Sequence, residues 1–136
     1  MELAMVVLKN ILFISTLIYA GIYDYKRRII PDRVHVIIMI SALLSQFSII
    51  QSILGLLILP IPFIIPIFFN ENCIGGGDIK LVGAIGFYLG LTKGTLAMII
   101  GLSLSTIVSL LLKKHRNQLV PLAPYLATGS IIAFLI

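Results

Sequence analysis

The chain has little of what a soluble or disulfide-stabilised domain requires. It contains a single cysteine, Cys73, and only 11% of its 136 residues are charged. One cysteine excludes an internal disulfide and leaves no cysteine pair for a structural zinc site. An average soluble domain carries about 25% charged residues. The composition therefore excludes an ordinary water-soluble domain.

What the chain has in excess is apolar side chains and, to a smaller degree, positive charge. Its residues are 60% hydrophobic with a net charge of +5, and its mean hydropathy is +1.15. This composition indicates a single integral membrane domain over residues 1–136, with the lipid bilayer as its partner. The basic residues lie in short connections without interleaved aromatic side chains, so we expect no nucleic-acid binding.

Apolar runs dominate the chain and set its expected architecture. A helix needs about 20 apolar residues to cross a bilayer, and fewer where neighbouring helices shield it. We expect an all-α membrane protein, an up-and-down bundle of about six transmembrane helices. Pro60, Pro62 and Pro66 predict a kink or break in the third helix, and short turns are expected at residues 51–52 and 92–94. The expected helices cover residues 3–23, 34–50, 53–69, 79–91, 95–112 and 120–136.

Loop charge predicts the orientation in the membrane. Eight of the ten basic residues lie in or next to the connections after the first, third and fifth expected helices, whereas Lys93 lies on the opposite side. Positively charged loops remain in the cytoplasm. We therefore expect a multi-pass protein of the cytoplasmic membrane, with both termini outside and residues 71–80 in the cytoplasm. The eight basic residues are Lys26, Arg27, Arg28, Arg33, Lys80, Lys113, Lys114 and Arg116.

The main polar interruption is a glycine-rich stretch in which Gly75, Gly76 and Gly77 directly precede Asp78. Consecutive glycines allow backbone conformations that a side chain would forbid. An acid beside a membrane-spanning segment is costly unless water or a partner meets it, which makes Asp78 a functional candidate. The alternative is that Asp78 only caps the following helix.

A second acid, Asp24, adjoins the first apolar run at the same expected membrane depth as Asp78. Two aspartates a few Å apart share a proton, and in aspartic proteases such a pair activates a water molecule and protonates the scissile carbonyl. The helix dipoles would leave the shared proton mostly on Asp24, because Asp78 begins a helix and Asp24 ends one. The alternative for Asp24 is an interfacial ion pair with Lys26, Arg27 or Arg28.

Neighbouring charged residues have simpler interpretations. Pro31 is placed to open the second helix, and Asp32 to cap it. Lys80 is interpreted as an interfacial anchor, because residues two apart on a helix do not face each other and it would not reach Asp78. Glu71 is expected to be a solvated loop acid or a contact for a basic substrate segment.

Nucleophilic and metal chemistry find little support. The two histidines, His35 and His115, lie far in sequence from the glycine-rich stretch. No serine, cysteine or threonine therefore has an obvious base partner beside that stretch. Two aspartates and two scattered histidines also do not form a metal-ligand pattern, so we expect neither a metal nor a cofactor.

Three motifs follow one another along the chain. Asp24 begins Asp-x5-Ile-Pro-Asp, which contains Pro31; Gly-Gly-Gly-Asp-Ile-Lys-Leu follows at residues 75–81, and Pro-Leu-Ala-Pro-Tyr-Leu-Ala at residues 121–127, with Gly129 two residues later. Together they resemble the type IV prepilin peptidase family, GxGD-type aspartic proteases of the membrane, whose late segment reads Pro-Phe-Gly-Pro-Phe/Tyr-Leu-Ala. The resemblance covers the catalytic six-helix region, nearly the whole chain.

The resemblance implies cleavage of the leader from prepilin-like substrates (pilins, pseudopilins or Flp/Tad-type precursors) at the cytoplasmic face of the membrane. It assigns the catalytic roles to Asp24 and Asp78. It also implies that residues of the three motifs and the loop contact the substrate. These candidate substrate-binding residues are Gly75, Gly76, Gly77, Pro31, Pro121, Pro124, Tyr125 and Glu71.

Two departures from the family pattern and two alternatives stand beside this expectation. The paired-cysteine domain with N-methyltransferase activity does not occur in the sequence, so we expect no methylation, and Ala123 replaces the usual glycine of the late motif. The alternatives are another GxGD protease, of the presenilin or signal-peptide-peptidase type, and a small non-enzymatic transporter or assembly protein. The sequence predicts neither the individual prepilin nor the oligomeric state.

Overall fold

The computed structural model describes residues 1–27, 29–44, 48–69, 76–111 and 122–136, and every regular element within them is α-helical. The all-α class is therefore confirmed. The helices are α1 Glu2–Arg27, α2 Asp32–Leu43, α3 Ile49–Ile58, α4 Ile61–Phe69, α5 Gly76–Leu111 and α6 Ala123–Leu135.

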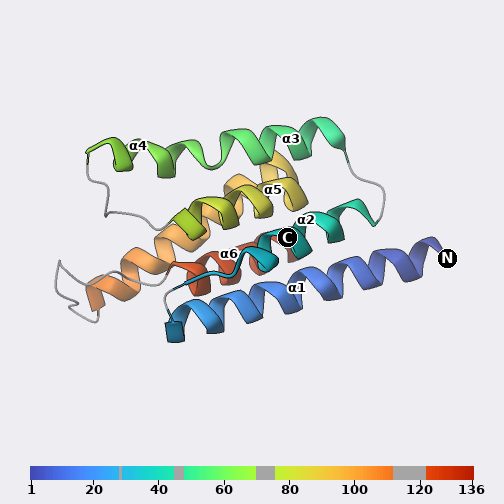
Figure 1. Ribbon diagram of the computed structural model, residues 1–136, viewed down its shortest axis with the longest axis horizontal. Coiled ribbons are helices and arrows are strands. Elements are labelled where there is room, and N and C mark those ends of the chain that lie inside the picture. The colour runs from blue at the N-terminus through green and yellow to red at the C-terminus, as the bar shows by residue number, and fades with distance from the viewer. Residues whose placement is uncertain (28, 45–47, 70–75, 112–121) are drawn as a thin grey trace.

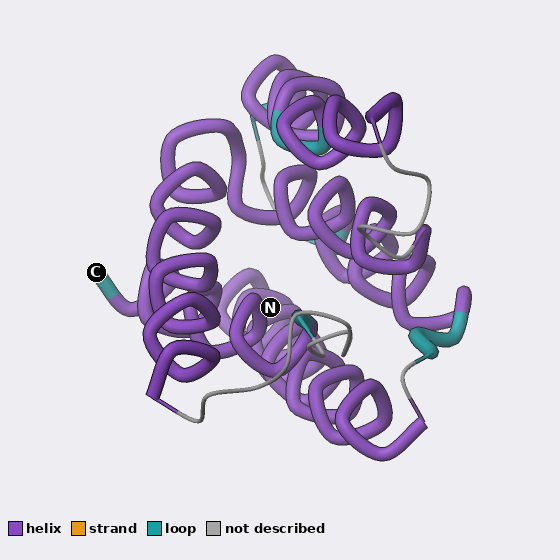
Figure 2. Tube along the Cα trace, turned by 90° about the vertical axis from the view of Figure 1, so that its left-hand side faces the viewer, coloured by secondary structure: helices purple, strands orange, loops and turns teal. Residues whose placement is uncertain are grey.

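The helices lie side by side in one bundle (Figures 1 and 2). Helix α5 is central: it packs against α2, α3 and α6, while α1 packs against α2 and α6. The rings of Phe13 on α1 and Tyr88 on α5 also stack, with 3.7 Å between their centroids. The C-terminal end of α1 and the N-terminal ends of α2 and α5 thus meet at one end of the bundle.

Helix α5 reverses direction at Gly90. This residue has φ 82° and ψ 176°, a conformation inside an otherwise helical run that is essentially restricted to glycine. The second half of α5 returns alongside the first (Figure 1), and a Cβ built on Gly94 would lie only 3.4 Å from the Cα of Gly86. The expected pair of antiparallel helices is present, with its turn at Gly90 rather than at residues 92–94.

The expected break at the prolines is also present. Helix α3 ends at Ile58, and α4 begins at Ile61 after a turn in which the N–H groups of Phe63 and Ile64 donate to the Pro60 carbonyl. Pro66 lies inside α4. A proline ring cannot donate to the preceding turn, so it interrupts a helix without requiring a change in chain direction.

The boundary between the second and third expected helices is wrong. Helix α2 ends at Leu43 and α3 begins at Ile49, so the expected turn at residues 51–52 lies inside a helix. The cause is tertiary packing. Ser52 is buried, and Gly55 approaches Gly86 so closely that a Cβ on Gly55 would lie 2.2 Å from the Gly86 carbonyl oxygen. Small side chains are common where membrane helices make such contacts.

The expected count of about six membrane spans is not confirmed. Among the described residues, three stretches are long and apolar enough to cross a membrane: α1, Ile49–Phe69 and α5. Helix α6 is a shorter apolar helix, and the 12 residues of α2 extend only about 18 Å. Large apolar side chains such as Ile53 and Leu110 are exposed, which fits a surface that faces lipid.

Candidate active site

A cavity of about 320 Å³ lies where the end of α1 meets the beginnings of α2 and α5. Both predicted catalytic acids line it, one from α1 and one from α5. The other contributors come from the connection before α2 and from the first turns of α2 and α5. The lining residues are Asp24, Ile29, Ile30, Asp32, Gly76, Gly77, Asp78 and Lys80.

Asp24 lies in the last turn of α1 and is only 5% exposed. Its Oδ2 accepts a hydrogen bond from the backbone N–H of Ala123 at 3.1 Å. Ala123 is the first residue of α6, where backbone N–H groups have no partner within their own helix. One turn earlier on α1, a Cβ on Gly21 would lie 3.2 Å from the Cα of Pro124. The start of α6 is therefore seated on the end of α1.

Asp78 is the third residue of α5 and lies inside its first turn. Its Oδ1 is buried and has no hydrogen-bond partner among the described residues. Leaving a buried polar atom unpaired has a free-energy cost of about 1–3 kcal/mol, and such atoms in a native structure call for an explanation. Because Asp24 lines the same cavity, the two carboxyl groups share one space.

His35 on α2 contacts the glycine-rich turn. It is 7% exposed, and its Nε2 lies 3.1 Å from the carbonyl oxygen of Gly77. Burial lowers the pKa of His35 from its ordinary value of 6.5; Asp32 acts in the opposite direction and Lys80 reinforces the lowering. Helix α2 lies outside the three stretches long enough to span a membrane. Sequence reasoning missed this residue because a histidine in an apolar helix carries no signal of a contact 42 residues away.

Asp32 and Lys80 form an ion pair on the cavity, with 3.3 Å between Oδ1 and Nζ. Both side chains are exposed, to 82% and 63% respectively. The expected capping role of Asp32 is wrong: the N-cap position of α2 is Pro31, no side-chain capping bond forms, and Asp32 lies in the first turn. Lys80 turns toward Asp32 across the cavity. An exposed pair of this kind contributes little to stability.

The remaining candidate substrate-binding residues divide into two groups. Pro31, Pro124 and Tyr125 do not appear among the residues that line the cavity. Pro124 packs on α1 at Gly21, and the carbonyl oxygen of Tyr125 lies 3.0 Å from where a Cβ on Gly101 would be. These residues help to seat α6. The other group, Glu71, Gly75 and Pro121, lies outside the described residues.

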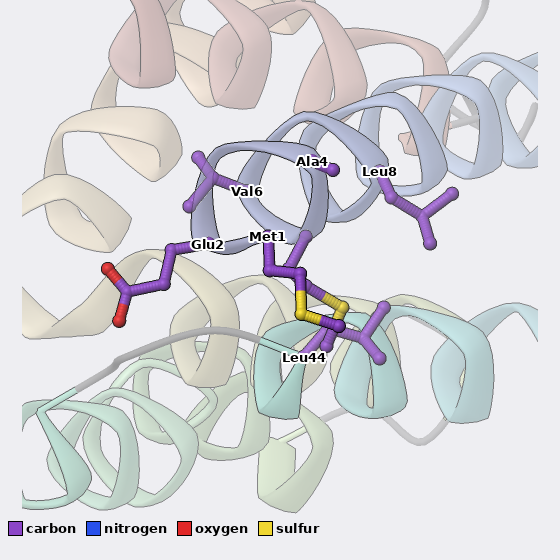
Figure 3. Close-up of a pocket in the computed structure, with 7 residues that line it drawn as sticks. Met1, Glu2, Ala4, Val6, Leu8 and Leu44 are labelled. Atoms are coloured by element: carbon purple, nitrogen blue, oxygen red, sulfur yellow. The ribbon is translucent and has the colours of Figure 1, made fainter.

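A larger cavity of about 610 Å³ lies at the opposite end of α1 (Figure 3). Apolar side chains, including Met1, Met5 and Leu44, line most of it, and Glu2 supplies its single carboxyl group. Along α1, Glu2 and Asp24 are separated by about 33 Å. One isolated acid among apolar side chains offers no acid–base pair, so the smaller cavity is the candidate active site.

Comparison with known proteins identifies the family of the chain. The sequence profile of the type IV leader peptidase family matches residues 11–113, which include every residue that lines the smaller cavity. The chain is 31% identical over 138 aligned residues to the prepilin leader peptidase/N-methyltransferase of Bacillus subtilis (strain 168).

The alignment with that relative covers 92% of this chain and 54% of the Bacillus protein, so the chain spans about half of its length. No solved structure gives a significant match. The profile match extends over well more than half of the chain and includes both acids of the cavity. The chain therefore belongs to the type IV leader peptidase family.

Proposed function

We propose that this protein is a membrane aspartic endopeptidase that removes the leader peptide from type IV prepilin-like precursors. The observation that carries the proposal is the shared cavity of Asp24 and Asp78, two acids from separate helices of a peptidase-family chain. Pilins, pseudopilins and Flp/Tad-type precursors are the proposed substrates. The proposal covers the peptidase function in the relative's name and not its N-methyltransferase function.

The hydrogen bonds of the two acids support a division of roles. The Ala123 N–H that donates to Asp24 Oδ2 favours the ionised form of Asp24. Asp78 Oδ1 has no partner among the described residues. We therefore assign the shared proton to Asp78, which reverses the assignment made from helix position alone.

The reaction then follows from these roles. Asp24 takes a proton from a water molecule as that water attacks the scissile carbonyl carbon, and Asp78 gives its proton to the carbonyl oxygen. When the tetrahedral intermediate collapses, Asp24 gives its proton to the leaving amine and Asp78 recovers its own. The pair begins and ends the cycle with one proton.

The proposed membrane face follows from charge. Lys26, Arg27 and Lys80 lie at the end of the bundle that holds the cavity, and Arg33 lies in the first turn of α2 at the same end. Positively charged loops favour the cytoplasmic side. We assign the cavity to the cytoplasmic face of the cell membrane and both termini to the outer side, with α5 crossing the membrane twice around Gly90.

The proposed substrate path uses the glycines. Gly76 and Gly77 line the cavity, and a Cβ built on Gly76 would meet no atom within 4 Å. An extended peptide can therefore approach the backbone of this turn closely. This position supports a substrate-binding role for Gly76 and Gly77, whereas the roles of Glu71, Gly75 and Pro121 stay predictions from the sequence.

The decisive experiment is co-expression of the protein with a prepilin and separation of precursor from mature product. Cleavage by the wild type and a loss of about 100-fold or more in Asp24→Asn and Asp78→Asn are expected, since positioned acid–base groups contribute about 10²–10⁴-fold. Glu2→Gln, at the far end of α1, is the matched control and should cleave normally. Full cleavage by either aspartate variant would exclude the paired-acid mechanism. Proton flux through liposomes that depends on Asp78, without cleavage, would favour a transporter.

A further inference from the structure

Three contacts of unequal strength link residues 30–35, which include the start of α2, to the start of α5 beside the cavity. The side chain of Ile30 packs against Gly77, where a Cβ would lie 3.3 Å from the Ile30 Cβ. Lys80 pairs with Asp32 in an exposed position. His35, buried on α2, lies 3.1 Å from the Gly77 carbonyl oxygen. Of these three contacts, the histidine bond is the one that a buried polar side chain makes.

The direction of this hydrogen bond is fixed by its partners. A carbonyl oxygen can only accept, so Nε2 of His35 carries the hydrogen and donates to Gly77. The other ring nitrogen, Nδ1, is buried without a partner among the described residues. The orientation of the ring is therefore set on one side by Gly77, and the residue after Gly77 is Asp78.

We propose that His35 is a positioning residue, which holds the Gly77 carbonyl against α2 and thereby keeps the Asp78 carboxyl directed into the cavity beside Asp24. The inference rests on the catalytic role proposed for Asp78. Gly76 and Gly77, the first two residues of α5, have no side chain to restrict the backbone before Asp78. The partly buried hydrogen bond from His35 to Gly77, one residue before the acid, narrows the range of positions that the Asp78 carboxyl group can take.

The strengths of the three contacts favour the histidine as the restraint. An exposed Lys–Asp pair is screened by water and salt and typically contributes little. A hydrogen bond in a buried site acts at lower dielectric and is correspondingly stronger. The Ile30 contact is apolar and has no directional preference. Only the His35 bond fixes both a distance and an orientation at Gly77.

Side-chain geometry supplies a matched pair of variants. The Nε2 of glutamine is as many bonds from Cβ as the Nε2 of histidine, so His35→Gln can still donate to Gly77. Asparagine is one bond shorter, so its amide occupies the place of Nδ1 and His35→Asn cannot reach the carbonyl. Ser41→Ala, which alters another buried polar side chain of α2 away from the cavity, is the control.

The experiment compares prepilin cleavage by these variants with that of the wild type. We expect His35→Asn to lower kcat about 10-fold with KM little changed, because a misplaced reacting group costs up to about 100-fold. His35→Gln and Ser41→Ala should keep kcat within about threefold of the wild type. A difference of this size corresponds to a small change in barrier height. Equal kcat in His35→Asn and His35→Gln overturns the proposal.

A substrate-independent measurement separates this inference from the proposed function. A hydrophobic carbodiimide modifies buried protonated carboxyl groups, and mass spectrometry locates the product. The rate of Asp78 modification should change in His35→Asn and match the wild type in His35→Gln. If the wild type cleaves no prepilin, the proposed function fails, and this measurement still tests the position of Asp78. Identical rates in all three proteins overturn the inference.

Discussion

The backbone N–H of Ala123 donates a hydrogen bond to Oδ2 of Asp24 across 3.1 Å. The contact joins the first residue of α6 to the last turn of α1, and both partners are buried. It gives the late motif a direct connection to one of the two acids. It also accounts for the departure at Ala123, because alanine offers the same backbone N–H that the glycine of the family pattern would offer.

The first prediction removes this donor. Ala123→Pro eliminates the N–H while keeping a φ that suits the first residue of a helix. A hydrogen bond to a charged group is worth about 1.5–3 kcal/mol, so cleavage should fall at least about 10-fold. Ala123→Gly keeps the N–H and should cleave at a rate close to that of the wild type.

Protein yield is the check on this comparison, because a proline restricts the residue before it, here Leu122, whose φ of −83° and ψ of −28° are helical. Ala123→Pro should still fold to a measurable extent and show the loss in kcat per folded molecule. Cleavage by folded Ala123→Pro at the wild-type rate would mean that the bond to Asp24 has no part in the reaction.

The second prediction concerns the pH dependence of cleavage. The proposed cycle needs one proton on the pair, so activity should fall at low pH, where both acids are protonated, and at high pH, where both are ionised. A plot of kcat/KM against pH should therefore be bell-shaped. A rate that rises to a plateau at high pH would instead indicate a single base acting without an acid partner.

The third prediction concerns Asp32 and Lys80. Because both side chains are largely exposed, we expect their coupling energy in a double-mutant cycle of Asp32→Asn and Lys80→Met to be about 0.2–1 kcal/mol, decreasing with added salt. Unfolding by denaturant in detergent measures it. A coupling of several kcal/mol would show that the pair, rather than His35, is the main restraint on the first turn of α5.

Those parts of the fold that depend on local chain properties were predictable from sequence. The all-helical class, the break at Pro60 and the reversal within α5 follow from apolar runs, a missing proline donor and a glycine at the turn. The two acids lie at one end of the bundle because Asp24 ends one apolar run and Asp78 begins another. Local composition was enough for these features.

The contacts that complete the site depend on residues far apart in sequence. His35 meets Gly77 at a separation of 42 residues, and Asp24 meets Ala123 at a separation of 99. The acceptor in the first contact and the donor in the second are backbone atoms. Almost every residue type carries these atoms, so the sequence does not mark them. The end of α2 differs from the sequence-based expectation for a related reason: only the packing of α3 against α5 places the polar residues 51–52 inside a helix.

The fourth prediction follows from the burial of His35. Burial lowers its pKa below the ordinary value of 6.5, so the folded protein takes up the proton less readily than the unfolded chain. The resulting stability is present above about pH 6.5 and is lost as the pH falls through the lowered pKa. Asp32 raises the pKa of the His35 ring and Lys80 lowers it, so the charges of both side chains contribute to this pKa.

The measurement is the melting temperature in detergent at pH 7.5 and pH 5.5. The wild type should lose stability on acidification, and His35→Gln, which does not titrate, should lose less. Acidification also affects the carboxyl groups in both proteins, so the informative quantity is the difference between the two pH-dependent shifts. Equal shifts would show that the pKa of His35 is the same in the folded and the unfolded protein.

The fifth prediction concerns the reversal of α5. Gly90 has φ 82°, and a Cβ there would also lie 3.3 Å from the Cβ of Gln51. Gly90→Ala should therefore lower the free energy of unfolding by about 1–3 kcal/mol, the cost of a side chain in a backbone region that is essentially restricted to glycine. Gly76→Ala is the matched control, because a Cβ at Gly76 meets no atom within 4 Å. It should unfold at the same denaturant concentration as the wild type or at a slightly higher one. Denaturant unfolding of both variants in the same detergent provides the comparison, and similar stability in both would mean that the chain does not need a glycine to reverse at this position.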